Sequence, residues 1–248
     1  MKVVNDLLNI NNMKIVQDTD YFNFSLDSVI LSDYVTPRKG DNIIDFCSGN
    51  CPVPMILTTK TKDKIYAVEL QKEVYKLGKE SIKLNKLDKQ IELLNMDVKD
   101  LCDKFETDTF DIITCNPPYF KINEQTKQND NEIKRIARHE IYLNLDDIFK
   151  VCKKLLKNNG KVIMIHRPER LEEIMKSMTD NNITPKIIRF IYPKEGQNSN
   201  MIIIEGRKNA RKGIKVLPPL IVHSKDNEYR DEIKKMFGGD RNESKELQ

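Results

Sequence analysis

Short apolar runs alternate with amphipathic segments along most of the chain. Strands are predicted for seven of these runs, at residues 42–47, 64–70, 90–97, 109–115, 161–166, 184–192 and 198–208. Helices are predicted between them, at residues 52–59, 71–85, 145–156 and 169–178. Strands joined through helices pair in parallel, whereas the last two runs are joined by a short loop that contains Gly196. The pattern predicts an α/β fold, a doubly wound, seven-stranded and mostly parallel sheet with an antiparallel terminal hairpin.

Two segments stand outside this alternation. Residues 1–40 precede the first predicted parallel strand, and their second half predicts a helix that is capped by Ser25 or Asp27. Residues 121–138 are polar, lack a regular period and are predicted to form a loop directly after the fourth strand. We therefore expect an N-terminal extension at residues 1–40 and one domain at residues 41–248.

The composition is typical of one large globular domain, since 39% of the 248 residues are hydrophobic. No apolar run has the length needed to cross a bilayer, and the first residues include Asn and Asp where a signal peptide has its apolar core. We expect a cytoplasmic protein with no membrane partner. The five cysteines and three histidines show no spacing of a metal site, so reduced thiols and no metal are expected. The oligomeric state is left open.

Positive charge is concentrated in one part of the chain. The whole sequence carries a net charge of +4, whereas residues 181–215 hold eight basic and two acidic residues. Such a segment suits a polyanion such as nucleic acid. A solvated surface in a lysine-rich protein explains the charge equally well, so both interpretations stay open.

Acidic residues follow three successive predicted strands. Asp45, Glu69 and Asp97 each lie at or near the carboxyl end of a strand, which is where ligands bind in doubly wound sheets. Glu69 follows Asp45 by 24 residues, a spacing at which an acid commonly accepts hydrogen bonds from ribose hydroxyls. Each acid alone could be a helix cap or a surface charge. Together they favour a site for a nucleoside cofactor.

The fourth predicted strand ends in the run Asn116-Pro117-Pro118-Tyr119. Two prolines in succession cannot continue a strand, because neither has a backbone N–H and both fix φ. A simple turn would explain the run. The alternative is that Asn116 and Tyr119 are held at the strand end to bind a flat substrate.

These motifs together resemble a known family. The runs DFCSGN, VEL, NMD and NPPY resemble class I S-adenosylmethionine-dependent methyltransferases, which have a Rossmann-like fold, in the subgroup that methylates exocyclic or amide nitrogens. The runs at residues 22–35, 138–140 and 217–229 are similar to bacterial tRNA adenine-N6 methyltransferases, which modify adenine 37 beside the anticodon of a valine tRNA. The resemblance implies S-adenosylmethionine as cofactor and tRNA as partner.

The resemblance also implies roles for individual residues. The Asn116 side chain and the Pro117 carbonyl would accept hydrogen bonds from the target amino group, with Pro118 fixing the turn and Tyr119 stacking on the base. The extension at residues 1–40 would close the pocket. The cofactor-binding residues would be Phe24, Asp27, Asp45, Cys47, Gly49, Glu69, Leu70, Asp97, Val98 and Asn116. The candidates for nucleic-acid contact are Arg138, His139, Arg167, Lys208, Arg211 and Lys212.

The sequence departs from the family at the cofactor loop. The family pattern D-x-G-x-G-x-G here has cysteines at 47 and 51, and only Gly49 remains. Glycines in such loops permit positive φ, so their loss predicts weaker cofactor binding. Two other functions stay open: a protein glutamine-N5 methyltransferase, which uses the same NPPY chemistry, and a noncatalytic RNA-binding protein. Structural or surface roles are expected for His166 and His223.

Overall fold

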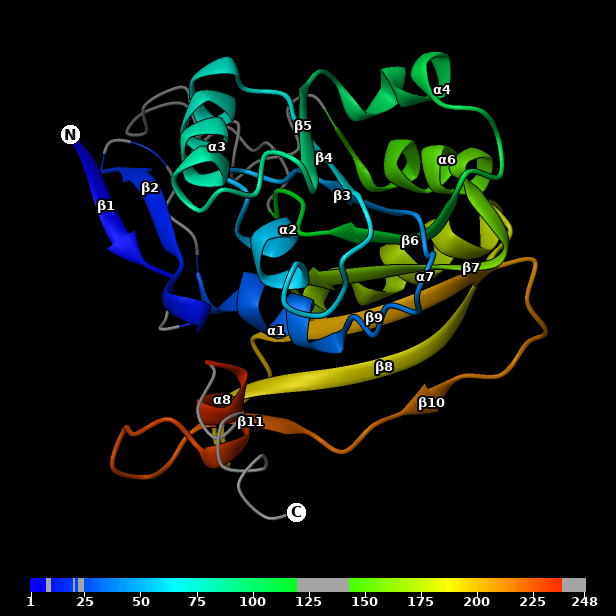
Figure 1. Cartoon of the computed structure of the whole chain (residues 1–248). Helices are drawn as coiled ribbons and strands as arrows, with labels where there is room; N and C mark the ends of the chain where they lie inside the picture. The colour runs from blue at the N-terminus through cyan, green and yellow to red at the C-terminus, as the bar shows by residue number, and fades with distance from the viewer. Residues whose placement is uncertain (8–9, 20, 22–24, 120–142, 238–248) are drawn as a thin grey trace, which may run out of the picture.

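The computed structural model describes residues 1–7, 10–19, 21, 25–119 and 143–237, and it is built around one large sheet (Figure 1). Five strands pair in parallel, in the order β7-β6-β3-β4-β5. Their bounds are β3 Ile43–Phe46, β4 Ile65–Glu69, β5 Ile91–Asn95, β6 Phe110–Cys115 and β7 Leu156–His166. The predicted α/β fold with a mostly parallel sheet is confirmed.

Beyond β7, the sheet continues with the antiparallel hairpin. Strand β9 (Met201–Lys208) runs antiparallel to β7, and β8 (Ile183–Lys194) runs antiparallel to β9. Two short strands, β10 (Lys215–Val216) and β11 (Leu220–His223), pair in parallel with β8 and bring the described sheet to nine strands. The sequence pattern missed both, because two and four residues are too few to show a period.

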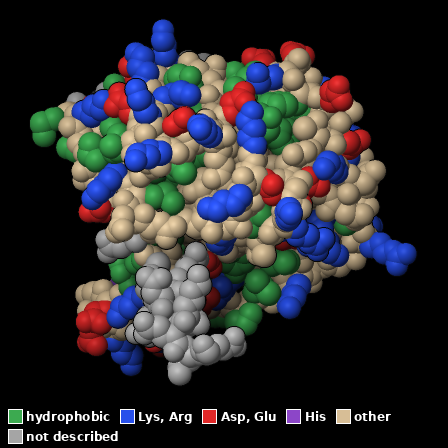
Figure 2. Space-filling model, in the orientation of Figure 1, with side chains coloured by type: hydrophobic (Ala, Val, Ile, Leu, Met, Phe, Trp, Pro, Cys, Tyr) green, Lys and Arg blue, Asp and Glu red, His purple; other side chains and the backbone are tan. Residues whose placement is uncertain are grey.

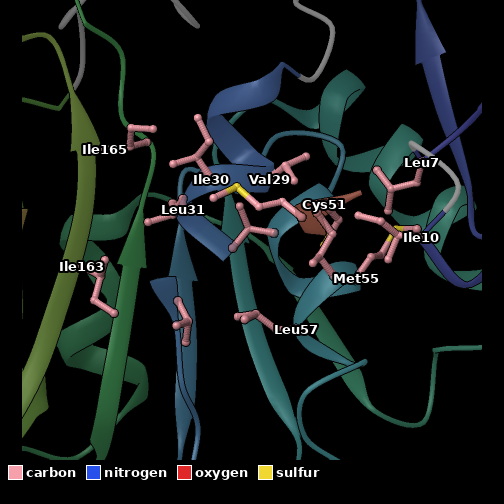
Figure 3. Packing of buried hydrophobic residues seen from close by; sticks show 14 of the residues in the cluster. Leu7, Ile10, Val29, Ile30, Leu31, Cys51, Met55, Leu57, Ile163 and Ile165 are labelled. Atoms are coloured by element: carbon pink, nitrogen blue, oxygen red, sulfur yellow. The ribbon is translucent and has the colours of Figure 1, made fainter. Parts of the chain in front are cut away.

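Helices cover both faces of the sheet. Helices α1 (Leu26–Tyr34), α2 (Pro52–Leu57) and α3 (Lys72–Leu84) contribute to one buried cluster. The short η2 (Val98–Asp100), α4 (Leu101–Lys104), α6 (Leu145–Leu155) and α7 (Leu171–Asp180) contribute to the other. In the first cluster, Ile30 and Leu31 of α1 lie between Ile165 of β7 and the residues around Cys51 (Figure 3). The central strands β3, β4 and β6 are therefore buried on both sides, as their apolar runs require.

The N-terminal extension packs on the same core. Strands β1 (Lys2–Asp6) and β2 (Lys14–Asp18) form an antiparallel hairpin with η1 (Ile10–Asn12) between them. The hairpin is attached to α3, because the Val16 N–H donates to Ser81 Oγ at 2.9 Å. Leu7 and Ile15 belong to the same buried cluster as Ile43 of strand β3. The extension is therefore built into the domain's core.

The boundary between α6 and β7 differs from the predicted one. Helix α6 ends at Leu155 and strand β7 begins directly at Leu156, five residues before the predicted strand, with an irregular register opposite residues 110–112. Asn159 adopts a φ of 62° within this strand, in the stretch between the predicted helix and the predicted strand. At the other end of the fold, η4 (Pro168–Arg170) leads into α7, and α8 (Asp231–Met236) packs beside α1.

Candidate active site

The first strand-end acid, Asp45, is buried between two strands. Its side chain is 1% exposed, and Thr114 of the neighbouring strand β6 donates a hydrogen bond from Oγ1 to Asp45 Oδ1 at 2.5 Å. Burial raises the pKa of Asp45 to about 7, with a smaller contribution from the nearby Glu69. An acid in this setting is a strong hydrogen-bond acceptor that water does not reach.

The second acid, Glu69, fixes the loop that follows β3. Its Oε2 accepts from the Gly49 N–H at 2.9 Å, and its Oε1 accepts from the Gln71 N–H at 2.8 Å. Burial raises the pKa of Glu69 to about 7, against the opposing effect of the backbone donors of Gln71, Gly49 and Leu70. A carboxylate offers about four acceptor positions, so these donors do not use all of them.

The loop at residues 47–51 holds positive φ angles at each position where the family has glycine. The φ angles are 57° at Cys47, 57° at Gly49 and 77° at Cys51. The other described non-glycine residues with positive φ are six asparagines, one aspartate and one lysine. Asparagine and aspartate tolerate this region better than cysteine does, so both cysteines are strained. The loop keeps the family's backbone path although two glycines are missing.

Neighbouring elements hold this loop tightly. The Asn50 side chain donates from Nδ2 to the Val16 carbonyl at 2.9 Å, which attaches the loop to β2 of the N-terminal extension. Helix α3 approaches so closely that a Cβ on Gly78 would lie 2.7 Å from Leu93 Cδ2 and 3.4 Å from the Gly49 carbonyl oxygen. Only glycine fits there without displacing its neighbours, so Gly78 is a part of the site that the motifs did not reveal.

The third acid is less buried than the first two. Strand β5 ends at Asn95, and Asp97 caps η2 two residues later by accepting from the Lys99 N–H at 2.9 Å. Leu70 directly follows Glu69 and is 39% exposed, which is unusual for a leucine next to a buried acid. Val98 is buried. An apolar surface beside hydrogen-bond acceptors is the chemistry that a nucleoside requires.

The residues at these strand ends fit S-adenosylmethionine. A buried side-chain oxygen without a hydrogen-bond partner, at the same end of the strands, supports this fit. Gln71 Oε1 is buried and has no hydrogen-bond partner in the structure, although it follows Glu69 by two residues. A buried acceptor without a donor is costly, and ribose hydroxyls or an ammonium group would satisfy it. Asp45, Glu69, Gln71 and the 47–51 loop would hold such a cofactor.

The NPPY residues lie at the same sheet edge, directly after β6. Tyr119 OH forms hydrogen-bond contacts with Asn116 Oδ1 and with Asp27 Oδ2, the latter at 3.1 Å. Asp27 is in the first turn of α1. Burial raises the pKa of Tyr119 well above its usual value, and Asp27 raises it further, so the hydroxyl keeps its proton. The structure thus brings Asp27, Asn116 and Tyr119 together, although the motifs that contain them are far apart in the sequence.

His166 also belongs to this edge, although the sequence suggested a structural or surface role. It ends β7, is fully buried and contacts the Tyr119 ring edge-on with centroids 5.3 Å apart. Burial lowers the pKa of His166 to about 4, and its Nδ1 accepts from the Arg167 N–H at 2.8 Å. The proton is therefore on Nε2, which has no hydrogen-bond partner in the structure. Its position at the end of a parallel strand was the signal that could have identified it.

The basic candidates lie at opposite ends of the sheet's strands. The site edge is the end at which the parallel strands have their carboxyl termini. Arg167 follows β7 at the site edge, where its guanidinium carbon is 5.8 Å from the Tyr119 ring centroid. Strand β9 is antiparallel, so it ends at the opposite edge, where Arg207 pairs with Lys161. Arg211 and Lys212 follow in the segment between β9 and β10, which lies on the right of Figure 1, and both are exposed. Lys208 is 12% exposed and bound to Asp108 at 2.7 Å and to the Leu156 carbonyl at 2.8 Å.

On the face shown in Figure 2, lysines and arginines are spread among acidic side chains and form no continuous patch. Phe24, Arg138 and His139 lie outside the described residues, as does the loop predicted at residues 121–138. Within the described part of the chain, no helix is both long and apolar enough to cross a membrane, and no cluster of metal-binding side chains occurs. The five cysteines are free thiols.

The sequence is similar to those of known proteins. A family model described as the methyltransferase small domain matches residues 23–184. A tRNA1(Val) (adenine(37)-N6)-methyltransferase of Aeromonas hydrophila subsp. hydrophila is 20% identical over 210 residues, which cover 83% of this chain and 84% of the relative. An enzyme of the same name from Haemophilus influenzae is 24% identical over 227 residues, covering 89% of this chain and 91% of the relative.

Solved structures share the fold. A crystal structure of a predicted O-methyltransferase from Agrobacterium tumefaciens has a TM-score of 0.70 at 18% identity and covers 86% of this chain and 96% of that chain. A geranyl diphosphate methyltransferase in complex with SAM has a TM-score of 0.54 at 13% identity, covering 73% and 84%. The family model spans well over half of the sequence and includes the 47–51 loop and the NPPY run. The chain therefore belongs to the methyltransferase small domain family.

Proposed function

We propose that this protein transfers a methyl group from S-adenosylmethionine to the N6 amino group of an adenine in tRNA, namely adenine 37 beside the anticodon of a valine tRNA. The single observation that carries the reaction type is the position of Asn116 and Pro117. Both lie directly after β6, beside the strand ends that hold Asp45 and Glu69. The names of the relatives support the choice of tRNA, adenine and position.

The chemistry depends on how the protein holds the target amino group. The lone pair of an adenine amino group is delocalised into the ring, which makes it a poor nucleophile. Acceptors on both N–H bonds, Asn116 Oδ1 and the Pro117 carbonyl, would localise that lone pair and aim it. Pro117 presents its carbonyl rigidly because its own φ is fixed and Pro118 restricts its ψ. When bound, S-adenosylmethionine would supply an electrophilic methyl group, so positioning carries much of the catalysis.

Tyr119 would hold the plane of the base. Stacking of a base on an aromatic side chain contributes about 1–3 kcal/mol by alanine substitution. The target adenine must leave its own stack to reach the strand end, and this single-stranded conformation is easiest in an anticodon loop. The protein would act in the cytoplasm as an RNA-modifying enzyme, without a metal or a membrane partner.

One observation favours a second candidate, a noncatalytic RNA-binding protein. Cys47 and Cys51 are strained at positions where the family has glycine. Against this, the loop retains its positive φ angles, and Glu69 still binds the Gly49 N–H. A glutamine-N5 methyltransferase would use the same Asn116 and Pro117 acceptors, so its substrate alone distinguishes it.

The test uses the full-length protein with labelled S-adenosylmethionine and total tRNA from a strain that lacks the modification. Nucleoside mass spectrometry should detect N6-methyladenosine, and fragment mapping should place it at position 37 of a valine tRNA. Asn198→Ala, an exposed asparagine at the β8–β9 loop, serves as the matched control for Asn116→Ala. Absence of methylated tRNA, with methylation of glutamine in a protein fraction, would favour the amide methyltransferase.

A further inference from the structure

We propose that the Tyr119 hydroxyl links the cofactor site to the target-base site, and that Asp27 is a positioning residue that acts on Asn116 through Tyr119. The inference rests on the proposed function, in which Asn116 accepts from the target amino group, and on the cofactor-binding role that the family resemblance implies for Asp27, here placed at the cofactor's ammonium group. It goes beyond that function because it predicts that the two ligands influence each other's affinity.

Three side chains from two distant segments meet at this point. Asp27 lies near the N-terminus of α1, whereas Asn116 and Tyr119 follow β6, about 90 residues later. The Tyr119 hydroxyl contacts Asp27 Oδ2 at 3.1 Å and also Asn116 Oδ1. The Tyr119 ring packs against the cluster that contains α1 and contacts His166 on another side. The hydroxyl is therefore held between an acidic group and the catalytic amide.

A count of protons shows why both contacts cannot be ordinary hydrogen bonds at once. A phenolic hydroxyl has one proton, and a carboxylate can only accept. If Tyr119 donates to Asp27, the Asn116 amide must turn its nitrogen toward the hydroxyl, and Oδ1 then faces away. If Tyr119 donates to Asn116 Oδ1, it takes a position that the target amino group needs. In both arrangements, Asn116 is not ready to receive the base.

Cofactor binding would change this balance. An ammonium group at Asp27 forms a hydrogen bond in which both partners are ionised, whereas the Tyr119 hydroxyl is a neutral donor. Tyr119 would then lose its acidic partner, and its ring would be free to leave Asn116 and stack on the incoming adenine. Because coupling between two sites is reciprocal, bound RNA would also strengthen cofactor binding. The competing explanation is that Tyr119 only attaches α1 to the NPPY run.

The experiment compares the wild type with Tyr119→Phe, which keeps the ring and removes the hydroxyl. Calorimetry would measure the affinity for S-adenosylhomocysteine, and fluorescence anisotropy would measure the affinity for an unmodified anticodon stem–loop with and without S-adenosylhomocysteine. Tyr34→Phe is the matched control, because it removes a hydroxyl at the other end of α1 that accepts from Arg189 at 3.1 Å.

For the wild type and Tyr34→Phe, S-adenosylhomocysteine should raise RNA affinity about five-fold or more, the usual lower range for coupled sites. In Tyr119→Phe the effect should fall below two-fold. The same variant should bind S-adenosylhomocysteine at least two-fold more tightly on its own, because no Tyr119–Asp27 contact has to be broken. Asp27→Asn should weaken S-adenosylhomocysteine binding and also remove the coupling.

Retention of wild-type coupling in Tyr119→Phe would overturn the link, and so would unchanged or weaker S-adenosylhomocysteine binding in that variant. The S-adenosylhomocysteine measurement needs no RNA. If the wild type bound S-adenosylhomocysteine but no tRNA, the proposed function would fail while this comparison still decided whether Tyr119 competes for Asp27. A purely structural attachment would lower the melting temperature of Tyr119→Phe without changing either binding result.

Discussion

The backbone N–H of Gly49 donates to Glu69 Oε2 at 2.9 Å, so the loop after β3 is fixed to the end of β4. One carboxylate therefore has two tasks. It holds the strained loop in place, and we propose that its remaining lone pairs accept hydrogen bonds from the ribose of the cofactor. Both tasks require the ionised form, which burial disfavours.

Cofactor affinity should consequently depend on pH through Glu69. With its pKa raised to about 7, Glu69 is mostly protonated at pH 6 and mostly ionised at pH 8. If the ionised form binds, affinity for S-adenosylhomocysteine should rise about ten-fold across that range, which follows from the titration of one group. Glu69→Gln should bind weakly at both pH values and lose the dependence. Asp45→Asn is the control: if it also abolishes the dependence, the titrating group is Asp45.

Asp45→Asn should stabilise the fold at alkaline pH. The pKa of Asp45 is raised to about 7 in the folded state, above its ordinary value of 3.8, so folding favours the protonated form. That contribution is complete below about pH 4 and is lost as pH rises through 7. Asparagine keeps the acceptor for Thr114 without the charge. The variant should gain about 2–4 kcal/mol in free energy of unfolding at pH 8, and almost nothing near pH 4.

Urea unfolding at the two pH values checks this prediction. The exposed Asp226→Asn serves as the control and should change stability equally little at both. A gain for Asp45→Asn that is the same at pH 4 and pH 8 would mean that Asp45 is not a buried acid with a raised pKa.

The strain at Cys47 and Cys51 should appear mainly in stability. The sequence alone predicted weaker cofactor binding, but the loop already holds positive φ at both residues, so binding need not impose it. At each position, glycine should be more stable than alanine by about 1 kcal/mol, because only alanine keeps the strained Cβ. Lys76, exposed in α3, should show the opposite order.

Chemical unfolding of the four cysteine variants and the two Lys76 variants tests this ordering. Affinity for S-adenosylhomocysteine should stay within about two-fold of the wild type in the double variant Cys47→Gly with Cys51→Gly. If alanine equals glycine in stability, the cysteines are not strained. If the parent binds no cofactor at millimolar concentration and the double-glycine variant does, the noncatalytic interpretation is favoured.

Two charge reversals of equal size distinguish the two edges of the sheet. Lys194 ends β8 at the site edge, and Lys225 lies beside it, since its carbonyl accepts from Lys194 Nζ at 3.4 Å. Arg211 and Lys212 are at the opposite edge. Reversal of Lys194 and Lys225 to Glu should weaken tRNA binding and lower the salt dependence by about two released counterions. Reversal of Arg211 and Lys212 should do less.

Filter binding at several salt concentrations measures both effects, with S-adenosylhomocysteine affinity as the check on folding. Lys208 is left unchanged, because it is mostly buried and paired with Asp108. Arg167 is also left unchanged, because its guanidinium lies over Tyr119. If reversal of Arg211 and Lys212 lowered tRNA affinity more than reversal of Lys194 and Lys225, the tRNA would contact the opposite end of the strands.

The sequence predicted the sheet and the strand-end acids because both depend on local pattern. Apolar runs separated by helices fix a parallel sheet, and parallel strands bring Asp45, Glu69 and Asn116 to one edge. It could not predict that β9 lies between β7 and β8, because the local pattern does not show which strand of the hairpin pairs with β7. The attachment of Asn50 to Val16 and the contact of Tyr119 with Asp27 join segments that share no local pattern.

The central claim is that Asn116 accepts a hydrogen bond from the target amino group. The most direct measurement is single-turnover methyl transfer to unmodified tRNA by Asn116→Ala, with S-adenosylhomocysteine affinity measured on the same preparation. Loss of a preorganised acceptor should slow transfer about 100-fold or more, while S-adenosylhomocysteine affinity stays within a few-fold of the wild type. Transfer by Asn116→Ala at the rate of the wild type and of Asn198→Ala would contradict the account.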